Sequence, residues 1–369
     1  MINSQSQNAG DSSTNMQAQH MVVNLVGIDE KRAREIYQEM ILQSKREYTQ
    51  EARNVANSRV TEFENRLMPK MAQVEGALEA FADPSFQLLL IEAQKAAAST
   101  ERLADYDLLS ELLIHRFQRG ENRITRAGIS LAVEIVDKIS DEALLGLTVA
   151  HVVNTIIPNT GDIHQGLDVL NDFCKKLFYS ELPKGQDWID HLDILDAVRL
   201  NPFGGFRKLE EYYQEVLSGY VDLGIENNSA NHNTAIEILN NNNLTQSILV
   251  EHALNSDFHR LCIPNKGKIN ELTATIQGTY EGRLVNIEQK LSDEHKQALN
   301  SIYDLYSNDG NKKQANVKSF MTEWDKRSNL KILREWWDNI PNGFSITSVG
   351  KVLAHSNAQR CDKTLPPLV

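Results

Sequence analysis

The chain has 369 residues, of which 41% are hydrophobic and 24% are charged, and its net charge is −12. Its three cysteines lie far apart and form no Cys-x-x-Cys pair, which argues against a disulfide framework and against a zinc knuckle. No apolar run approaches the ~20 residues of a membrane-spanning helix, and residues 1–20 lack the apolar segment of a secretion signal. We therefore expect a cytoplasmic protein that does not engage a membrane.

Residues 1–27 are predicted to form a flexible start and a short β arm. Gln, Asn and Ser dominate the first twenty residues, and a β-prone run that ends at a glycine follows at residues 20–27. A lone strand is unstable, so this run needs a partner. Two alternatives remain open, because the run can pack on its own chain or pair with another copy.

A single long helix is predicted at residues 28–69. Asp29 has the character of an N-cap, Pro69 marks the end, and one face is marked by side chains at steps of three and four residues. A helix of this length reaches about 60 Å and must lie across a large body or pack on another long helix. The candidate oligomerisation residues of the arm and the helix are Val22, Val23, Leu25, Tyr37, Ile41, Tyr48, Val55 and Phe63.

Residues 70–260 are predicted to form a central helical domain. Asp83-Pro84 and Ser140-Asp141 each combine an N-cap with a favourable first helical residue. His252 and His259 are expected on one helix near the end of the domain. The other expected helices are 84–99, 105–118, 124–139, 141–157, 162–178, 188–200 and 207–221.

Residues 261–369 are predicted to form a C-terminal helical domain. A short strand at residues 343–347 leads into a last helix, and this order is similar to a winged-helix unit. The predicted fold class is therefore all-α, a multi-helix bundle with a long N-terminal helix, a short N-terminal β arm and a small winged-helix-like C-terminal unit. The helices expected before the strand are 268–291, 293–307, 314–327 and 329–338.

No motif predicts a catalytic or metal site. The acidic residues between Asp187 and Asp196 follow each other at three-residue steps, which indicates a solvated helix face, because a metal needs ligands from more than one element. The sequence contains no HExxH, P-loop, dinucleotide-binding or GxSxG motif. We expect a protein without enzymatic activity and without a cofactor.

The C-terminal third offers the best candidate interaction surface. Residues 260–369 contain 16 lysines and arginines against 12 aspartates and glutamates, although the whole chain is acidic. With its tryptophans as anchors, this surface favours a protein partner or another copy, and nucleic acid bound through phosphates is the alternative. The residues predicted for it are Lys312, Lys313, Lys318, Lys326, Arg327, Lys331, Arg334, Trp336 and Lys351.

Two stretches carry a resemblance to a known group of proteins. Residues 10–18 resemble the GD-S-N-QA lead-in of an uncharacterised bacterial family, and residues 346–357 resemble its LTSVG-x-x-IA-x-AN close. The resemblance implies a bacterial, cytoplasmic, helical protein with no established activity, and by association a role in phage defence. We therefore predict a non-enzymatic interaction or scaffold protein that self-associates, with nucleic-acid binding or regulation as the alternative.

Overall fold

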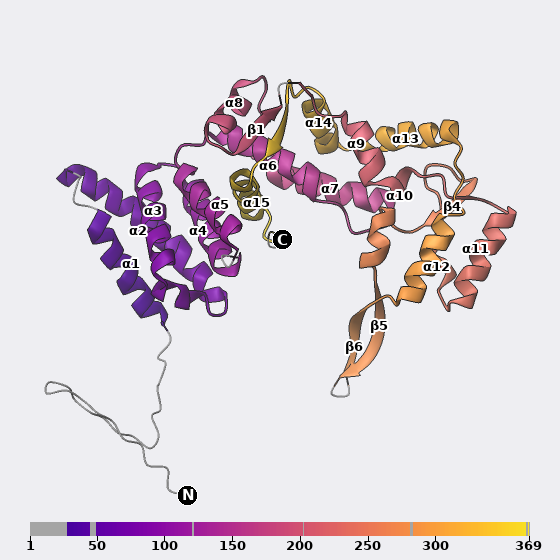
Figure 1. Cartoon of the computed structure of the whole chain (residues 1–369), viewed down its shortest axis with the longest axis horizontal. Helices are drawn as coiled ribbons and strands as arrows, with labels where there is room; N and C mark the ends of the chain where they lie inside the picture. The colour runs from indigo at the N-terminus through magenta and orange to yellow at the C-terminus, as the bar shows by residue number, and fades with distance from the viewer. Residues whose placement is uncertain are drawn as a thin grey trace, which may run out of the picture.

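The computed structural model describes residues 28–44, 49–119, 122–201, 203–280, 283–366 and 368. Most of these residues are helical and the strands are short, which confirms the expected helix-rich fold. Figure 1 shows the helices arranged in an arc, with the first helices at one end and a small unit with a β-hairpin at the other. The predicted β arm and Tyr48 lie outside the described residues.

Two helices replace the predicted single long helix. α1 (Glu30–Ser44) and α2 (Gln50–Gln73) are separate, and Thr49 has extended backbone and caps α2 through the N–H of Ala52. The two helices run antiparallel, since Tyr37 donates a hydrogen bond to the carbonyl of Val60 at 2.9 Å. The prediction was wrong because a short helical hairpin buries the same apolar face that a continuous helix would have exposed to a partner.

The helices after this hairpin begin where their capping residues predicted. The side chains of Asp83, Ser140 and Asp162 accept hydrogen bonds from the first turns of α3, α6 and α7. These helices pack into one large core with α1 and α2. The bounds are η2 (Ala77–Ala82), α3 (Pro84–Ser99), α4 (Leu103–Arg119), α5 (Arg123–Ile135), α6 (Asp141–Thr155), α7 (Ile163–Leu177) and α8 (Asp187–Ile194).

The last helix, α15 (Ser348–Cys361), lies inside this core rather than in a separate winged-helix unit. It packs against α4, α5 and α6. The preceding strand β7 (Gly343–Ile346) pairs antiparallel with β1 (Val198–Asn201). β1 occupies the second half of the helix predicted at residues 188–200, because that helix ends at Ile194 and Asp196 turns the chain with a φ of 58°. The winged-helix expectation is therefore wrong.

A smaller second core lies between residues 225 and 306. Three short strands, in the order β2 (Ile225–Glu226), β4 (Phe258–Leu261) and β3 (Leu249–Glu251), pack with two helices. The predicted domain boundary at residue 260 therefore falls within β4, and His252 and His259 do not share a helix. The helical elements of this unit are α11 (Ala230–Asn241), η3 (Gln246–Ile248), η4 (Lys266–Glu271) and α12 (Asp293–Tyr303).

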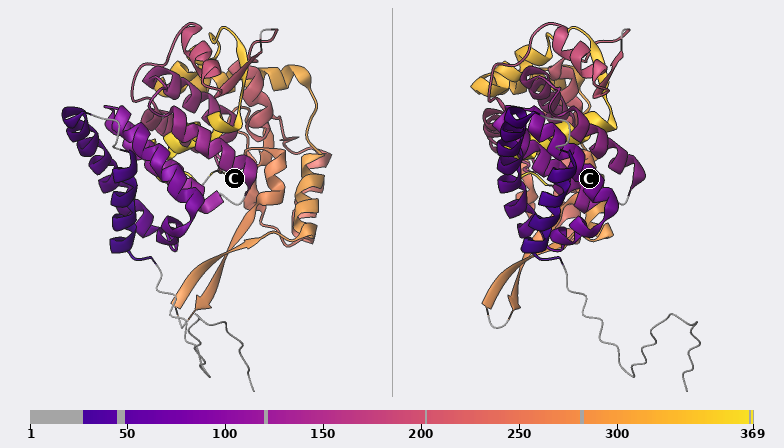
Figure 2. Two further views of the ribbon diagram at one scale, coloured as in Figure 1. Left: turned by 60° about the vertical axis from the view of Figure 1, so that its left-hand side comes forward. Right: turned by 90° about the vertical axis from the view of Figure 1, so that its left-hand side faces the viewer.

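A β-hairpin stands where a helix was predicted at residues 268–291. β5 (Thr273–Tyr280) and β6 (Arg283–Lys290) pair antiparallel along their whole length and project from the body of the molecule (Figures 1 and 2). Thr273, Thr275, Val285 and Ile287 are β-branched and recur at every second position, which favours strands over a helix.

Aromatic side chains fill the core around the remaining helices. Trp324, Trp336 and Trp337 are all buried, and Trp336 and Trp337 pack against Trp188 and Phe206 with ring centroids 5.9 and 4.7 Å apart. These tryptophans therefore contribute to the core of the fold. The helices concerned are α9 (Leu209–Val216), α10 (Ser218–Val221), α13 (Gly310–Asp325) and α14 (Ser328–Trp337).

Candidate functional site

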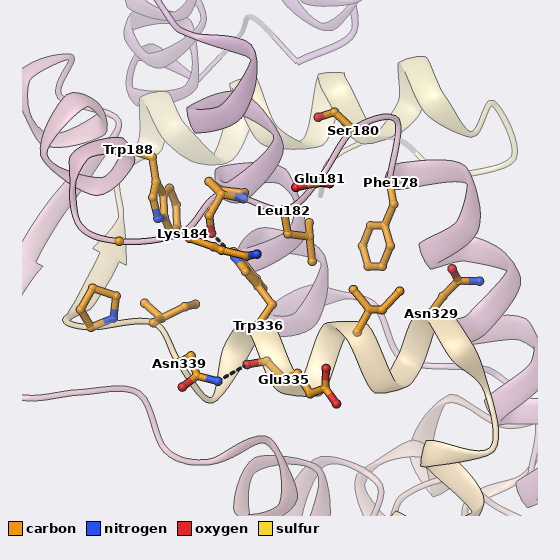
Figure 3. A pocket seen from close by; sticks show the side chains of 15 residues that line it. Phe178, Ser180, Glu181, Leu182, Lys184, Trp188, Asn329, Glu335, Trp336 and Asn339 are labelled. Carbon is orange, nitrogen blue, oxygen red and sulfur yellow. Dashed lines mark hydrogen bonds between the residues drawn. The ribbon is translucent and has the colours of Figure 1, made fainter.

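A pocket of about 870 Å³ opens between the loop that follows α7 and the exposed face of α14 (Figure 3). We call it the α14 pocket. The loop contributes Phe178 and residues 180–185, α8 contributes Trp188, and α14 and the turn after it supply the opposite wall. A cavity of this volume falls in the range of ligand and peptide sites.

The walls of the α14 pocket are mainly apolar, and a hydrogen bond joins the two walls. Trp336 donates a hydrogen bond of 2.7 Å from its indole N–H to the carbonyl of Pro183, which joins α14 to the loop. Figure 3 shows Leu182 and Phe178 on the loop side of the pocket, opposite Trp336 on the helix. Ile332 of α14 also lines the pocket and is 46% exposed, so apolar surface is open to a binding partner.

The polar groups of the α14 pocket divide into two kinds. The side-chain amides of Asn329 and Asn339 already donate to residues of the chain, at Asn171 and at the carbonyl of Glu335. The charged side chains of Glu181 and Lys184 are exposed at the rim. The arrangement is that of an apolar recognition surface with a polar border.

The loop also presents unused backbone donors. The N–H groups of Glu181, Leu182 and Lys184 donate no hydrogen bond to any residue that the structure describes, and the segment belongs to no helix or strand. Backbone donors left open beside an apolar pocket are the combination by which proteins bind an extended peptide. Sequence reasoning missed this site, because its walls come from segments far apart in the chain.

A second polar feature is fully enclosed along α15. His151 and His355 are hydrogen-bonded at 3.3 Å between Nε2 and Nδ1, and Ser356 bonds to Nδ1 of His115 at 3.0 Å. Asn357 donates to the hydroxyl of Thr148 at 2.8 Å. These bonds link α15 to α4 and α6. His355, Ser356 and Asn357 also belong to the stretch that carries the family resemblance.

Burial keeps these histidines neutral. It is the main reason that the pKa values of His115 and His151 fall to about 4, and the neighbouring His355 lowers both further. Burial also lowers the pKa of His355 itself. Because the cluster is buried, we interpret it as a structural network rather than a catalytic one.

The four predicted oligomerisation residues that the structure describes do not form one surface. Tyr37, Ile41 and Phe63 are buried in the contact between α1, α2 and their neighbours, while Val55 is 51% exposed. The first three residues therefore cannot contact a second copy in this structure. The others, Val22, Val23, Leu25 and Tyr48, lie outside the described residues.

Most of the predicted basic surface is engaged by carboxylates. Lys313 pairs with Asp222 at 2.6 Å and Arg327 with Asp168 at 2.7 Å. Trp336, expected at the surface, is buried, although one side of it lines the α14 pocket. The three other pairs are Lys326 with Glu323, Lys331 with Glu335, and Arg334 with Asp325.

Two further features of the described residues bear on function. They contain no group of three or more His, Cys, Asp or Glu side chains arranged to hold a metal ion. None of their helices combines the length and the apolar character required to cross a bilayer.

Comparison with known proteins gives a family but no activity. The model of an uncharacterised protein family, for which no activity is established, matches residues 27–365, almost the whole chain. The chain belongs to that family. The matched range covers α15 and both walls of the α14 pocket, and begins after the lead-in at residues 10–18. Among curated proteins and solved structures, none matches the chain.

Proposed function

We propose that this chain is a non-enzymatic interaction protein that self-associates, with the β-prone run at residues 20–27 of one copy bound in the α14 pocket of another. The observation that carries the proposal is the pairing of open backbone donors at Glu181, Leu182 and Lys184 with the apolar wall around Ile332. A strand laid along the loop would accept hydrogen bonds from Leu182 and Lys184, because alternate N–H groups of an extended segment lie on the same side, and would insert apolar side chains into the pocket.

The composition of the run matches the pocket. Residues 21–26 contain three valines, a leucine and a methionine and no charged side chain, which suits the mainly apolar walls of the pocket. Val22 and Val23 are β-branched and favour the extended backbone that such binding requires.

The position of the run favours binding between copies over binding within one chain. Only Ile28 and Asp29 separate the run from α1, so it is tethered to the start of that helix. Figure 1 shows α1 and α14 in different parts of the arc, with α3 to α6 between them. A run tethered at α1 is therefore better placed to reach the pocket of a second molecule.

Light scattering after size exclusion tests the proposal on the full chain, on a chain without residues 1–27, and on Ile332→Glu. We expect the full chain to be oligomeric and both altered chains to dissociate, because the first lacks the inserted segment and the second places a charge in the pocket. Val169→Glu is the matched control, since Val169 is 51% exposed on α7 and lines no part of the pocket. It should keep the oligomer.

A labelled peptide of residues 18–29 gives the direct measurement. It should bind the chain without residues 1–27 and lose about tenfold or more in affinity against the same chain carrying Ile332→Glu, because a buried charge weakens an apolar contact strongly. A monomeric full chain, or a peptide that binds the Ile332→Glu chain equally well, would refute the proposal.

A further inference from the structure

A second pocket, of about 490 Å³, forms where three helices meet. We call it the α5 pocket. The last turn of α4 contributes His115 and Arg119, the first turn of α5 contributes Ile124, and the first turns of α15 contribute Lys351 and Val352. It shares no lining residue with the α14 pocket.

The α5 pocket carries positive charge in an acidic protein. Arg119 and Lys351 are exposed at its edge, and neither forms an ion pair with a residue that the structure describes. None of the described residues that line it is acidic, although the chain as a whole has a net charge of −12. Two cationic groups facing one cavity attract an anion, because no carboxylate among the described residues neutralises them there.

Neutral polar groups and two helix N-termini also favour an anion in the α5 pocket. Gln118, Thr125 and Ser348 line the cavity and offer hydrogen bonds. The N-termini of α5 and α15 both open at the cavity, so the positive ends of their dipoles lie toward it. The side chains of Asn122 and Thr347 each cap one amide, that of Ile124 and that of Gly350.

One wall of the cavity is apolar. Ile124 is 70% exposed, and beside it Ile129 and Val352 are buried and form the floor. An exposed isoleucine beside these two cations matches a ligand with an apolar or planar body and a charged end.

We propose that the α5 pocket binds a small organic anion, with its phosphate or carboxylate held between Arg119 and Lys351 and its body packed against Ile124 and Val352. Arg and Lys bind phosphate and carboxylate groups alike, so a ligand with either group fits the pocket. A nucleoside monophosphate and a short fatty acid are the simplest ligands of the two kinds.

Isothermal titration calorimetry of the full chain with AMP and with octanoate tests the inference, and adenosine serves as the uncharged counterpart of AMP. We expect one of the two anions to bind with a dissociation constant of about 1 mM or tighter, and adenosine to bind at least about tenfold more weakly than AMP where AMP is the ligand. Binding of AMP assigns the phosphate source, and binding of octanoate assigns the carboxylate source.

Variants then locate the site. The double variant Arg119→Gln, Lys351→Gln should weaken binding about tenfold or more, and so should Ile124→Glu, which adds a repelling carboxylate at an exposed position. The double variant Lys312→Gln, Lys318→Gln is the control, since it removes the same charge from the exposed face of α13. The inference fails if neither anion binds at about 10 mM, or if the pocket variants and the control variant bind equally well.

Discussion

At the scale of single residues, the histidines His115, His151 and His355 decide how the fold responds to acid. Their pKa values in the folded state lie below the ordinary value, mainly because burial disfavours the charged form. Between pH 6.5 and about 4 the unfolded chain therefore binds protons that the folded chain does not. Their contribution to stability is complete above pH 6.5 and is lost as the pH falls toward 4.

We therefore expect the free energy of unfolding to decrease between pH 7 and pH 5, measured by urea titration at each pH. His151→Gln should reduce this decrease by on the order of 1–3 kcal/mol, since Gln keeps a hydrogen-bonding group toward His355 but does not titrate. His164→Gln is the control, because the side chain of His164 is half exposed. An equal pH dependence in the wild-type chain and His151→Gln would contradict this account.

The histidine cluster could not have been predicted from the sequence. Each of its histidines looks isolated in the chain, because the partners come from α4, α6 and α15, which are distant in sequence. The same holds for Trp336, which stands among basic residues in the sequence but is buried beside Trp188. Residue type and local spacing do not reveal which side of a helix faces a distant segment.

At the scale of helices and strands, capping residues predicted where helices begin better than apolar spacing predicted where they end. The N-caps at Asp83 and Ser140 are confirmed, because a cap needs only its own first turn. The prediction of one long helix was wrong at Thr49, which is the N-cap of α2. The spacing of apolar residues by three and four positions continues from α1 into α2, because both helices bury that face, and the spacing therefore does not reveal the break. The hairpin at residues 273–290 was not predicted, because short apolar runs do not by themselves distinguish strands from a helix.

Gly350 shows how tightly one element is fixed. A Cβ added at Gly350 would lie 2.0 Å from the carbonyl oxygen of Ala197, at the point where α15 passes β1. We expect Gly350→Ala to lower the free energy of unfolding by about 1–3 kcal/mol or more, because the backbone must move to relieve the contact. Thermal and urea unfolding measure this directly.

Gly310 provides the comparison for that substitution. It is the first residue of α13, and an added Cβ meets no atom within 4 Å. Gly310→Ala should leave stability unchanged or raise it by about 0.4–1 kcal/mol, since alanine restricts the unfolded chain. If both substitutions had the same effect, the contact between Gly350 and Ala197 would not be the cause of the loss.

At the scale of the whole molecule, the connections between distant segments organise the fold. β1 pairs with β7, and α15 completes a core that begins at α1. The cores do not follow the order of the chain. The last helix packs in the same core as the first helices, whereas residues 225–306 pack around a core of their own. The helix-rich class was predictable from local patterns, whereas this arrangement depends on contacts that only the folded chain defines.

The distribution of charge bears on nucleic-acid binding, the alternative function. The basic residues of α13 and α14 look like a free stripe in the sequence, but five of the seven between Lys312 and Arg334 pair with carboxylates. A phosphate backbone would have to displace those carboxylates and approach a chain with a net charge of −12. The driving force for nucleic-acid binding through this surface is therefore small.

Fluorescence anisotropy with labelled duplex DNA and single-stranded RNA, at 50 mM and 200 mM salt, tests this expectation. We expect a dissociation constant weaker than about 100 µM at the higher salt, which is weaker than the range of about 1–100 µM for ordinary non-specific DNA binding. We also expect Lys312→Gln, Lys318→Gln to change it little, because only a few free cations are removed. Tight binding that falls steeply with salt and is lost in this double variant would show that the surface binds phosphates through Lys312 and Lys318 despite the neighbouring ion pairs. That result would make the basic surface, rather than the α14 pocket, the principal interaction site of the protein.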